Sequence, residues 1–536
     1  MKRDLYLQEA LRYVPHLIEL SDRNLLSPTF GCFDRAYWHY RTADFPSGMF
    51  QEAVLPLALL YKLNHPLNPL FGKERIRELV IGGIEFAIRS AHADGSCDDY
   101  FPYERAAGAA AFSLYACTEA FHILGLEESH PHFLPFFKKR AENLAEKGMR
   151  ESGTLSNHKA LIVLAVYNTF LLVQEPLLQQ KSETALLKLL SLQNSEGWFP
   201  EYEGCDPGYL TFTIDFLAKY YQKSNDVRVI EPLDRAISFA AHFLHPDGSF
   251  GGEYGSRNTF HFMPHGFELM GVQSPQALPV ARAFLNSLEL GTRSYIDDDR
   301  IMIHYVYNYI QAYTDYCQNS EFLQRASSEL TLQSFPQGGL AVFRQGDTAA
   351  IFSTKKGNGK IFKKGKLIFS DSGVIGKSSD GVVFTSHVFG GVEAFSLESG
   401  VLKMSGKMYR QDSILFTPWT FWIFRAFLIF AARWMNENTV RKMLQKKAIL
   451  KKKIPVPLTW SKEIDLHKLD KVTYTLNLQD PNWKIADLQI AADATFIYIA
   501  ASQPYQPGNL LPWIDLKYLL PALSENKKAV YEHILK

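Results

Sequence analysis

The chain has 536 residues, of which 46% are hydrophobic and 21% charged, and its formal net charge is +1. A chain of this length exceeds one ordinary core, so two or more domains are expected. The near balance of charge gives no general argument for nucleic acid, and no such partner is predicted. Five cysteines without a CxxC pair indicate reduced thiols, and the charged N-terminal segment carries no secretory signal, so a cytoplasmic location is expected.

A repeated pattern organises the first part of the chain. Each copy reads as a glycine turn, an aromatic residue, an acidic residue beside Tyr or Arg, and then an apolar helix. The clear copies begin at Asp94, Ser195 and Asp247, and three weaker ones bring the number to six, with a mean step of about 50 residues. Amphipathic segments such as GKERIRELVIGGIEFAIRSA lie between them. Each unit is therefore expected to be a hairpin of one exposed and one buried helix.

Six such hairpins predict a closed (α/α)6 toroid over residues 1–325, with an open solenoid as the alternative. In a toroid the N-termini of the inner helices meet at one mouth, where unpaired N–H groups favour anions. From about Leu330 the sequence changes to short alternating apolar runs separated by Gly, Asp, Asn and Ser. This texture predicts an antiparallel β-sandwich domain over residues 330–536.

One apolar helix is expected inside the β domain, near residues 417–450. Its apolar part is interrupted by Arg425 and Arg433 and is short for a helix that spans a bilayer. Two interpretations remain open. The helix packs between the two domains, or residues 417–453 make a peripheral contact with anionic lipid, which for a cytoplasmic protein means the inner face of the membrane.

Two inner helices begin with residues suited to proton transfer. Asn157 and His158 stand at the head of one helix, where Asn157 suits a carboxylate and His158 can exchange a proton; an Asn N-cap beside an incidental His is the structural alternative. Tyr202 and Tyr209 lie on either side of Pro207, which is typical of a first helical turn. Core packing with a hydrogen-bonded hydroxyl explains either tyrosine as well.

The segment from 247 to 270 collects the largest number of polar candidates. If its helix begins by Arg257, then Arg257, His261 and His265 share one face, because they are four residues apart. Burying all three without partners costs roughly several kcal/mol, so they are expected to line a polar cleft opposite Asn157 and His158. The other predicted substrate-binding residues are Tyr202, Glu253, Tyr254, Glu104 and Arg105.

The hairpin repeat, the Asn-His pair, a tyrosine about fifty residues later and the trailing β domain together resemble the heparinase II/III-like polysaccharide lyases. The resemblance implies β-elimination, or C5 epimerisation, on a uronate-containing acidic polysaccharide, without metal or cofactor. It also implies roles for site residues. Asn157 and His158 would neutralise the uronate carboxylate, Tyr209 (or Tyr202) would exchange the protons, and His261 or His265 would assist.

Two other classes of function stay open. An inverting glycoside hydrolase of (α/α)6 type would use two carboxylates with room for a water between them. A non-catalytic glycan-binding or scaffold protein would only stack sugars on its aromatic residues. A metal site is not predicted, because HFMPH lacks the glutamate of HExxH and no third ligand is marked by spacing. The acidic candidates for the hydrolase are Asp98, Asp99, Glu104, Glu201, Asp206 and Glu253.

Overall fold

The helical and β parts follow one another along the chain. The computed structural model describes residues 2–202, 204–295, 298–319, 331–411, 416–431, 453–495 and 504–536, with 435, 440 and 443 singly. Long helices end at Thr314 and strands begin at Thr331. The predicted order, helical hairpins and then an antiparallel β domain, is confirmed. The boundary itself, placed at 325 and 330, stays a prediction because residues 320–330 lie outside the described ones.

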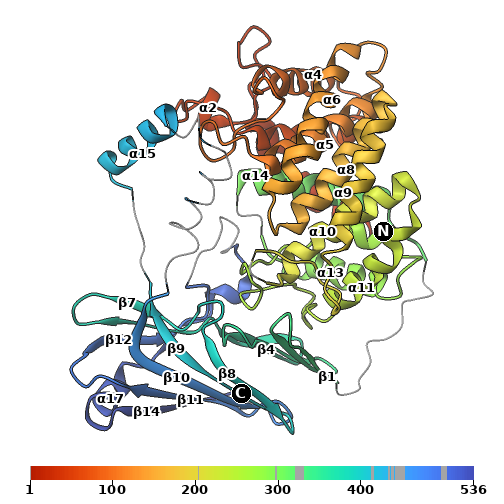
Figure 1. Ribbon diagram of the computed structural model, residues 1–536. Coiled ribbons are helices and arrows are strands. Elements are labelled where there is room, and N and C mark those ends of the chain that lie inside the picture. Colours follow the sequence, from red (N-terminus) through yellow and green to blue (C-terminus); the bar gives the residue numbers. More distant parts are fainter. Residues whose placement is uncertain are drawn as a thin grey trace.

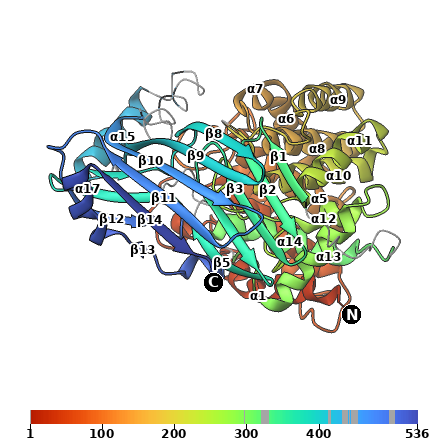
Figure 2. The same ribbon diagram turned by 90° about the horizontal axis from the view of Figure 1, so that it is seen from below.

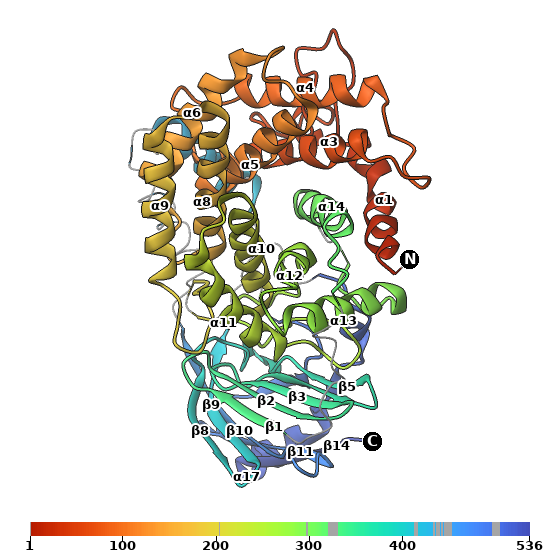
Figure 3. The ribbon, with the colours of Figure 1, turned by 90° about the vertical axis from the view of Figure 1, so that its right-hand side faces the viewer.

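Six helices of the described part line the inside of a ring (Figure 3). Each follows one of the six predicted turns, and each packs against the next along the chain. The sixth packs back onto the first, so the contacts run full circle and the ring is closed rather than open. The inner helices are α3 (Val54–Lys62), α5 (Ala107–Leu124), α8 (Ser156–Val173), α10 (Pro207–Ser224), α12 (Pro264–Leu269) and α14 (Asp299–Thr314).

A second set of helices surrounds the ring and packs on its outer side. These helices are amphipathic and bury one stripe each, whereas α8 buries residues around its whole circumference. The outer helices are α1 (Asp4–Glu19), α4 (Glu74–Arg89), α6 (Leu134–Asn143), α9 (Pro176–Leu190), α11 (Ile230–Ala241) and α13 (Ala277–Leu290). Shorter helices are α2 (Arg35–Trp38), α7 (Met149–Glu151) and α17 (Leu520–Asn526).

The repeat glycines have a conformational reason. Gly95, Gly197 and Gly248 have φ of 84°, 103° and 79°, a left-handed region that a residue with a Cβ rarely adopts. At Gly248 a Cβ would also lie 2.6 Å from the carbonyl oxygen of Ala283. Each of these turns therefore requires glycine, and the tight turn delivers the chain to the start of an inner helix.

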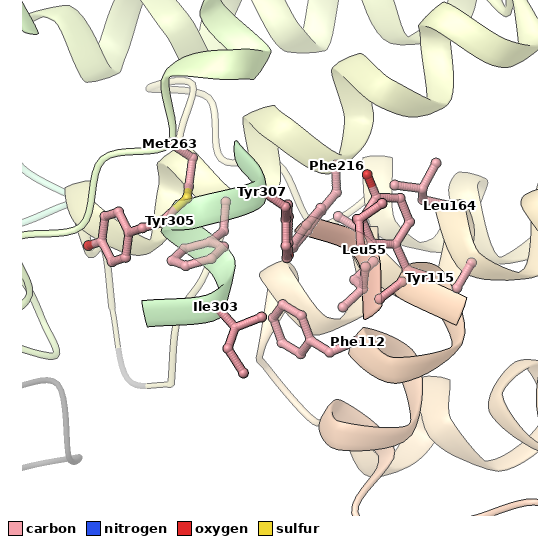
Figure 4. Packing of buried hydrophobic residues seen from close by; sticks show 14 of the residues in the cluster. Leu55, Phe112, Tyr115, Leu164, Phe216, Met263, Ile303, Tyr305 and Tyr307 are labelled. Carbon is pink, nitrogen blue, oxygen red and sulfur yellow. The ribbon is translucent and has the colours of Figure 1, made fainter. Parts of the chain in front are cut away.

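Aromatic side chains fill the interior of the ring (Figure 4). Phe112 of α5 lies 5.8 Å from Phe216 of α10, and Tyr115 of α5 lies 5.9 Å from Tyr307 of α14, measured between ring centroids. All four are buried. Large rings from helices that are distant in sequence thus join the inner helices into one core.

The β domain consists of two antiparallel sheets (Figure 2). The first is a meander of β1 (Thr331–Phe335), β2 (Leu340–Gln345), β3 (Thr348–Ser353), β4 (Gly359–Lys363) and β5 (Lys366–Asp371). The second contains β6 (Val374–Ser378), β7 (Val383–Thr385), β8 (Val392–Glu398), β9 (Val401–Arg410), β10 (Pro455–Asp465), β11 (Lys471–Leu478), β12 (Ile485–Ile490), β13 (Ile514–Asp515) and β14 (Lys528–Ile534).

The first sheet is buried on both faces. In β2, Leu340 and Val342 belong to the same apolar core as the helices, whereas Phe343 packs against the second sheet. Successive side chains of a strand point to opposite faces, and the buried part of this strand, residues 340–343, is accordingly apolar at every position. The sheet is fixed to the helical domain by contacts such as Phe335 on Phe239, with ring centroids 4.8 Å apart.

The predicted apolar helix lies on the helical domain. It forms α15 (Pro418–Phe430), beside α2 and away from the sheets (Figure 1). Among its residues only Leu428 is buried, so the interpretation as a helix packed between the two domains is wrong. Most of the remaining predicted span to residue 450 lies outside the described residues.

Candidate functional site

The predicted polar residues meet at the N-terminal ends of α8 and α10. Asn157 lies in the first turn of α8, whose N-cap is Leu155, so the interpretation of Asn157 as an N-cap is wrong. Helix α10 begins at Pro207, as predicted, and Asp206 caps it by accepting a hydrogen bond from the backbone N–H of Tyr209 at 3.0 Å. This cap fixes the first turn of α10 and hence the position of the Tyr209 ring.

Glu201 connects the residues of the site. Its Oε1 accepts hydrogen bonds from the backbone N–H of Asn157 at 2.9 Å and from the Asn157 side-chain amide at 2.7 Å. Its Oε2 lies 3.2 Å from Nη1 of Arg257. Glu201 is 1% exposed, and this burial raises its pKa to about 7, although Arg257 and the hydrogen bonds from Asn157 oppose the shift. A proton on Glu201 is therefore gained and lost near neutral pH.

Arg257 lies between the acidic group and two tyrosine rings. Its guanidinium carbon is 3.9 Å from the ring centroid of Tyr209 and 4.5 Å from that of Tyr202. The backbone N–H of Arg257 donates to Asp206 at 2.8 Å, so the α10 cap also holds this loop. A flat cation stacked on two aromatic faces has little freedom to turn, and its charge stays directed at the tyrosines.

His261 is a neutral imidazole against Tyr209. The two rings are edge to face with centroids 4.9 Å apart, and Nδ1 of His261 is 2.7 Å from the hydroxyl of Tyr305. Burial, helped by the charge of Arg257, lowers the pKa of His261 to about 3. At neutral pH this histidine therefore carries no charge. Burial also raises the pKa of Tyr209 well above its ordinary value, so both partners are uncharged there.

His158 is the more accessible histidine of the site. It is half-buried, and its ring meets Phe112 edge to face at 6.2 Å between centroids. Gly108 of α5 faces it so closely that an added Cβ would lie 2.6 Å from Cε1 of the imidazole. The missing side chain at position 108 thus makes room for His158.

Sequence reasoning missed His304 and Arg300, both on α14. His304 stacks on Phe112 at 4.2 Å between centroids, and its Nδ1 lies 2.6 Å from Oε2 of the buried Glu52. Arg300 donates to Asp99 at 2.9 Å. The sequence signal for both residues is the sixth repeat unit, because they lie in the first two turns of its inner helix.

A loop of the second repeat forms the exposed edge of the site. Tyr100 is 66% exposed, and the guanidinium of Arg300 lies 4.5 Å from its ring centroid. Glu104, predicted to bind substrate, instead accepts hydrogen bonds from the backbone N–H groups of Asp99 and Tyr100 at 3.2 and 2.7 Å. Nη1 of Arg105, also predicted to bind substrate, donates a hydrogen bond to the carboxylate of Asp94 at 2.7 Å. Both residues order the loop, which presents Tyr100 and, less exposed, Tyr103.

The predicted helical face of Arg257, His261 and His265 does not exist. Helix α12 begins only at Pro264, and proline at a first position is a start signal that the sequence did contain. His265 turns away to Asp315, with 2.8 Å between Nε2 and the carboxylate. All three side chains are buried, contrary to the expectation, because each has found a partner in the fold.

Glu253 and Tyr254 face the β domain rather than the tyrosines. Glu253 pairs with Lys360 of β4 at 3.1 Å, and the hydroxyl of Tyr254 lies 2.9 Å from Nε2 of His245. Both side chains are buried. Their contacts fix the loop that carries Arg257 against the first sheet.

The acidic side chains of these turns are already engaged. Asp206 holds the α10 cap and the Arg257 backbone, and Asp98 accepts from the backbone N–H groups of Tyr103 and Arg105 at 2.8 and 3.0 Å. Among the described residues, no group of three or more His, Cys, Asp or Glu side chains is placed to hold a metal ion. The groups that remain for chemistry are Glu201, with its raised pKa, a tyrosine, histidines and an arginine.

Solved structures of polysaccharide lyases are similar to this chain. A chondroitin AC lyase from Streptomyces coelicolor matches with 10% identity and a TM-score of 0.48, over 92% of this chain and 68% of the lyase. A heparinase III matches with 11% identity and a TM-score of 0.41, over 91% and 71%. A heparan sulfate lyase from Pedobacter heparinus matches with 13% identity and a TM-score of 0.38, over 82% and 66%. No family model and no curated protein matches the sequence.

Proposed function

We propose that the protein is a polysaccharide lyase that cleaves a uronate-containing acidic polysaccharide by β-elimination. The observation that carries the proposal is the contact of Tyr209 with both Arg257 and the neutral His261 at the end of the helical ring. A phenol beside a fixed cation and an uncharged imidazole is suited to moving a proton without metal or cofactor. The Tyr209 side chain is half-buried, so part of it stays open to solvent.

The reaction needs three things from the site. The uronate carboxylate must be neutralised so that the C5 proton becomes acidic; a base must take that proton; and O4 must receive a proton as the C4–O4 bond breaks. The electron pair of the C5–H bond then forms the C4=C5 double bond. In this proposal the Tyr209 hydroxyl gives its proton to O4 and its oxygen takes the proton from C5, so that the phenol is regenerated. His158, half-buried at the head of the neighbouring inner helix α8, assists.

The donors suited to the uronate carboxylate are the amide of Asn157 and the guanidinium of Arg257. Glu201 holds both of them. A substrate carboxylate would compete with an ionised Glu201 for these donors, and it would meet no charge repulsion once Glu201 is protonated. Since the pKa of Glu201 is raised to about 7, Glu201 can take up a proton as the substrate carboxylate binds, at a pH where enzymes ordinarily work.

The site favours elimination over hydrolysis. An inverting hydrolase needs one carboxyl group as acid and a second as base, with a water between them. Asp206, Asp98 and Glu104 are each committed to backbone N–H groups of their own turns. Epimerisation shares the first proton transfer with elimination but leaves the C4–O4 bond intact, so the products separate the two.

The test is turnover of the full chain on a panel of uronate-containing polysaccharides, followed by the ultraviolet absorbance of 4,5-unsaturated products. Tyr209→Phe removes the hydroxyl and should lower kcat by about 100-fold or more, because general acid–base catalysis contributes at least that much. Tyr221→Phe, a change at the other end of the same helix, is the matched control and should leave kcat unchanged. Both variants should melt at the wild-type temperature.

Other outcomes point elsewhere. Chain cleavage that yields saturated ends would assign the protein to the hydrolases, and C5 inversion without cleavage to the epimerases. Binding of polysaccharide with no product from the wild type would make it a glycan-binding protein. Full activity in Tyr209→Phe would remove Tyr209 from the chemistry.

A further inference from the structure

Helix α15 exposes an unusual amount of apolar surface. Trp419 is 78% exposed, Trp422 66% and Ile423 61%. Isolated exposed apolar side chains are common on proteins, but contiguous ones mark a surface that contacts something else. The exposed large apolar residues of this short segment are Phe416, Trp419, Phe421, Trp422, Ile423 and Phe430.

The opposite side of α15 is fixed to the helical domain. Leu428 is buried, and Phe424 and Phe427 pack in the same small cluster with Phe101. Arg425 pairs with Asp44 at 2.9 Å. Arg425 is the only charged residue of the helix, and it points inward, so the outward side of α15 is left without a charge.

Length decides how such a helix could meet a bilayer. Helix α15 has 13 residues, which at 1.5 Å per residue is about 20 Å, shorter than the hydrocarbon core of about 30 Å. It cannot cross. A helix of this kind with tryptophan and phenylalanine on one side lies in the plane of the membrane interface. Its start is set by a capping box between Thr417 and Thr420, so the helix is defined before any partner binds.

Charge identifies the kind of surface. In the sequence from 431 to 453, which directly follows α15, eight residues are basic and one is acidic. Most of these residues lie outside the described ones, and only their charge enters here. A run of lysines and arginines that follows an apolar helix in the sequence is complementary in charge to anionic phospholipid.

We propose that α15 binds the surface of an anionic lipid bilayer, with Trp419, Trp422 and Ile423 inserted at the level of the headgroups. A bilayer can take up a convex apolar helix as it stands, whereas a protein partner would have to offer a matching groove. Because α15 packs on Phe101, the residue after Tyr100, a bound membrane lies beside the exposed edge of the candidate site. The proposal does not depend on the proposed function.

The test is co-sedimentation of the full chain with vesicles of phosphatidylcholine alone and of phosphatidylcholine mixed with phosphatidylserine. We expect binding to the mixed vesicles. Without the anionic lipid, binding should be weaker by about fivefold for each basic side chain whose attraction is lost. The double variant Trp419→Ser, Trp422→Ser should bind about tenfold or more weakly, since affinity follows the buried apolar area. Added salt should weaken wild-type binding.

The matched control is the double variant Leu26→Ser, Val227→Ser. These side chains are 93% and 69% exposed but belong to other parts of the surface, so membrane binding should be unchanged. Wild-type binding that is equal on neutral vesicles, or absent from both, would overturn the proposal. So would a concentration-dependent dimer in light scattering that the tryptophan variant abolishes, because α15 would then be an interface between copies.

Discussion

Replacing Glu201 by glutamine tests the electrostatics of the candidate site without a substrate. Glutamine keeps an oxygen that can accept from Asn157, but it cannot bind or release a proton. In the wild type, burial raises the pKa of Glu201 from 4.5 to about 7. Between these two values the folded protein holds a proton on Glu201 that the unfolded chain has released.

The size of the effect follows from this difference. A pKa shift of one unit corresponds to about 1.4 kcal/mol, so the rise from 4.5 to about 7 corresponds to about 3 kcal/mol. Since the folded state binds more protons in this window, the free energy of unfolding falls as the pH rises from about 4.5 to 7. The contribution is fully present below the lower value and lost above the upper one. The glutamine variant lacks this contribution.

The measurement is urea-induced unfolding of both proteins, followed by far-ultraviolet circular dichroism across this pH range. The free energy of unfolding of the wild type minus that of the variant should decrease by about 3 kcal/mol from about pH 4.5 to pH 8. Loss of the Arg257 ion pair adds a constant offset, which does not change this decrease. Subtracting the variant removes the titration of the remaining groups. A difference that stays flat, or that increases with pH, would refute the reasoning, because the ion pair with Arg257 would then outweigh burial.

Three further changes test the support of the site. Gly108→Ala should keep or raise the melting temperature, since alanine favours a helix by up to about 1 kcal/mol, yet lower turnover about tenfold by displacing His158. Asp206→Ala should lower the free energy of unfolding by about 1–3 kcal/mol in urea titrations, because α10 loses its cap and the Arg257 N–H its acceptor. Lys356→Met should cost a similar 1–3 kcal/mol and loosen the Arg257 loop, seen as faster amide exchange there, because the lysine ammonium donates to carbonyl oxygens of that loop. Unchanged turnover in Gly108→Ala, unchanged stability in Asp206→Ala, or unchanged amide exchange in Lys356→Met would contradict the corresponding prediction.

The sequence was informative wherever a feature depends on neighbours along the chain. Turns about 50 residues apart marked the inner helices, and four of them contain a glycine with positive φ, a conformation that favours glycine whatever surrounds it. Pro207 marked the start of α10 in the same way. Pro264 carried an equally clear signal, and the expectation of a helix from Arg257 went wrong by giving the spacing of histidines more weight than this proline.

Side-chain contacts between residues distant in sequence could not be predicted from the sequence. Glu201 and Arg257 are 56 residues apart, and His304 and Glu52 are 252 apart. Nothing in the local pattern says that these pairs meet, or that Glu253 would turn to the β domain. A buried charged side chain pairs with the group that tertiary packing places next to it, and local propensity does not determine which group that is.

The sequence by itself thus determined the helical hairpins, their number and the change to strands, because turn conformation and hydrophobic period are short-range properties. The tertiary structure confirmed the predicted closure of the ring over the open alternative. It alone decided that α15 lies on the surface, and that Glu201 titrates near neutral pH while His261 stays uncharged. The physical reason is the same in each case. Closure, exposure and pKa depend on what surrounds a residue in space, and those surroundings come from segments distant in the chain.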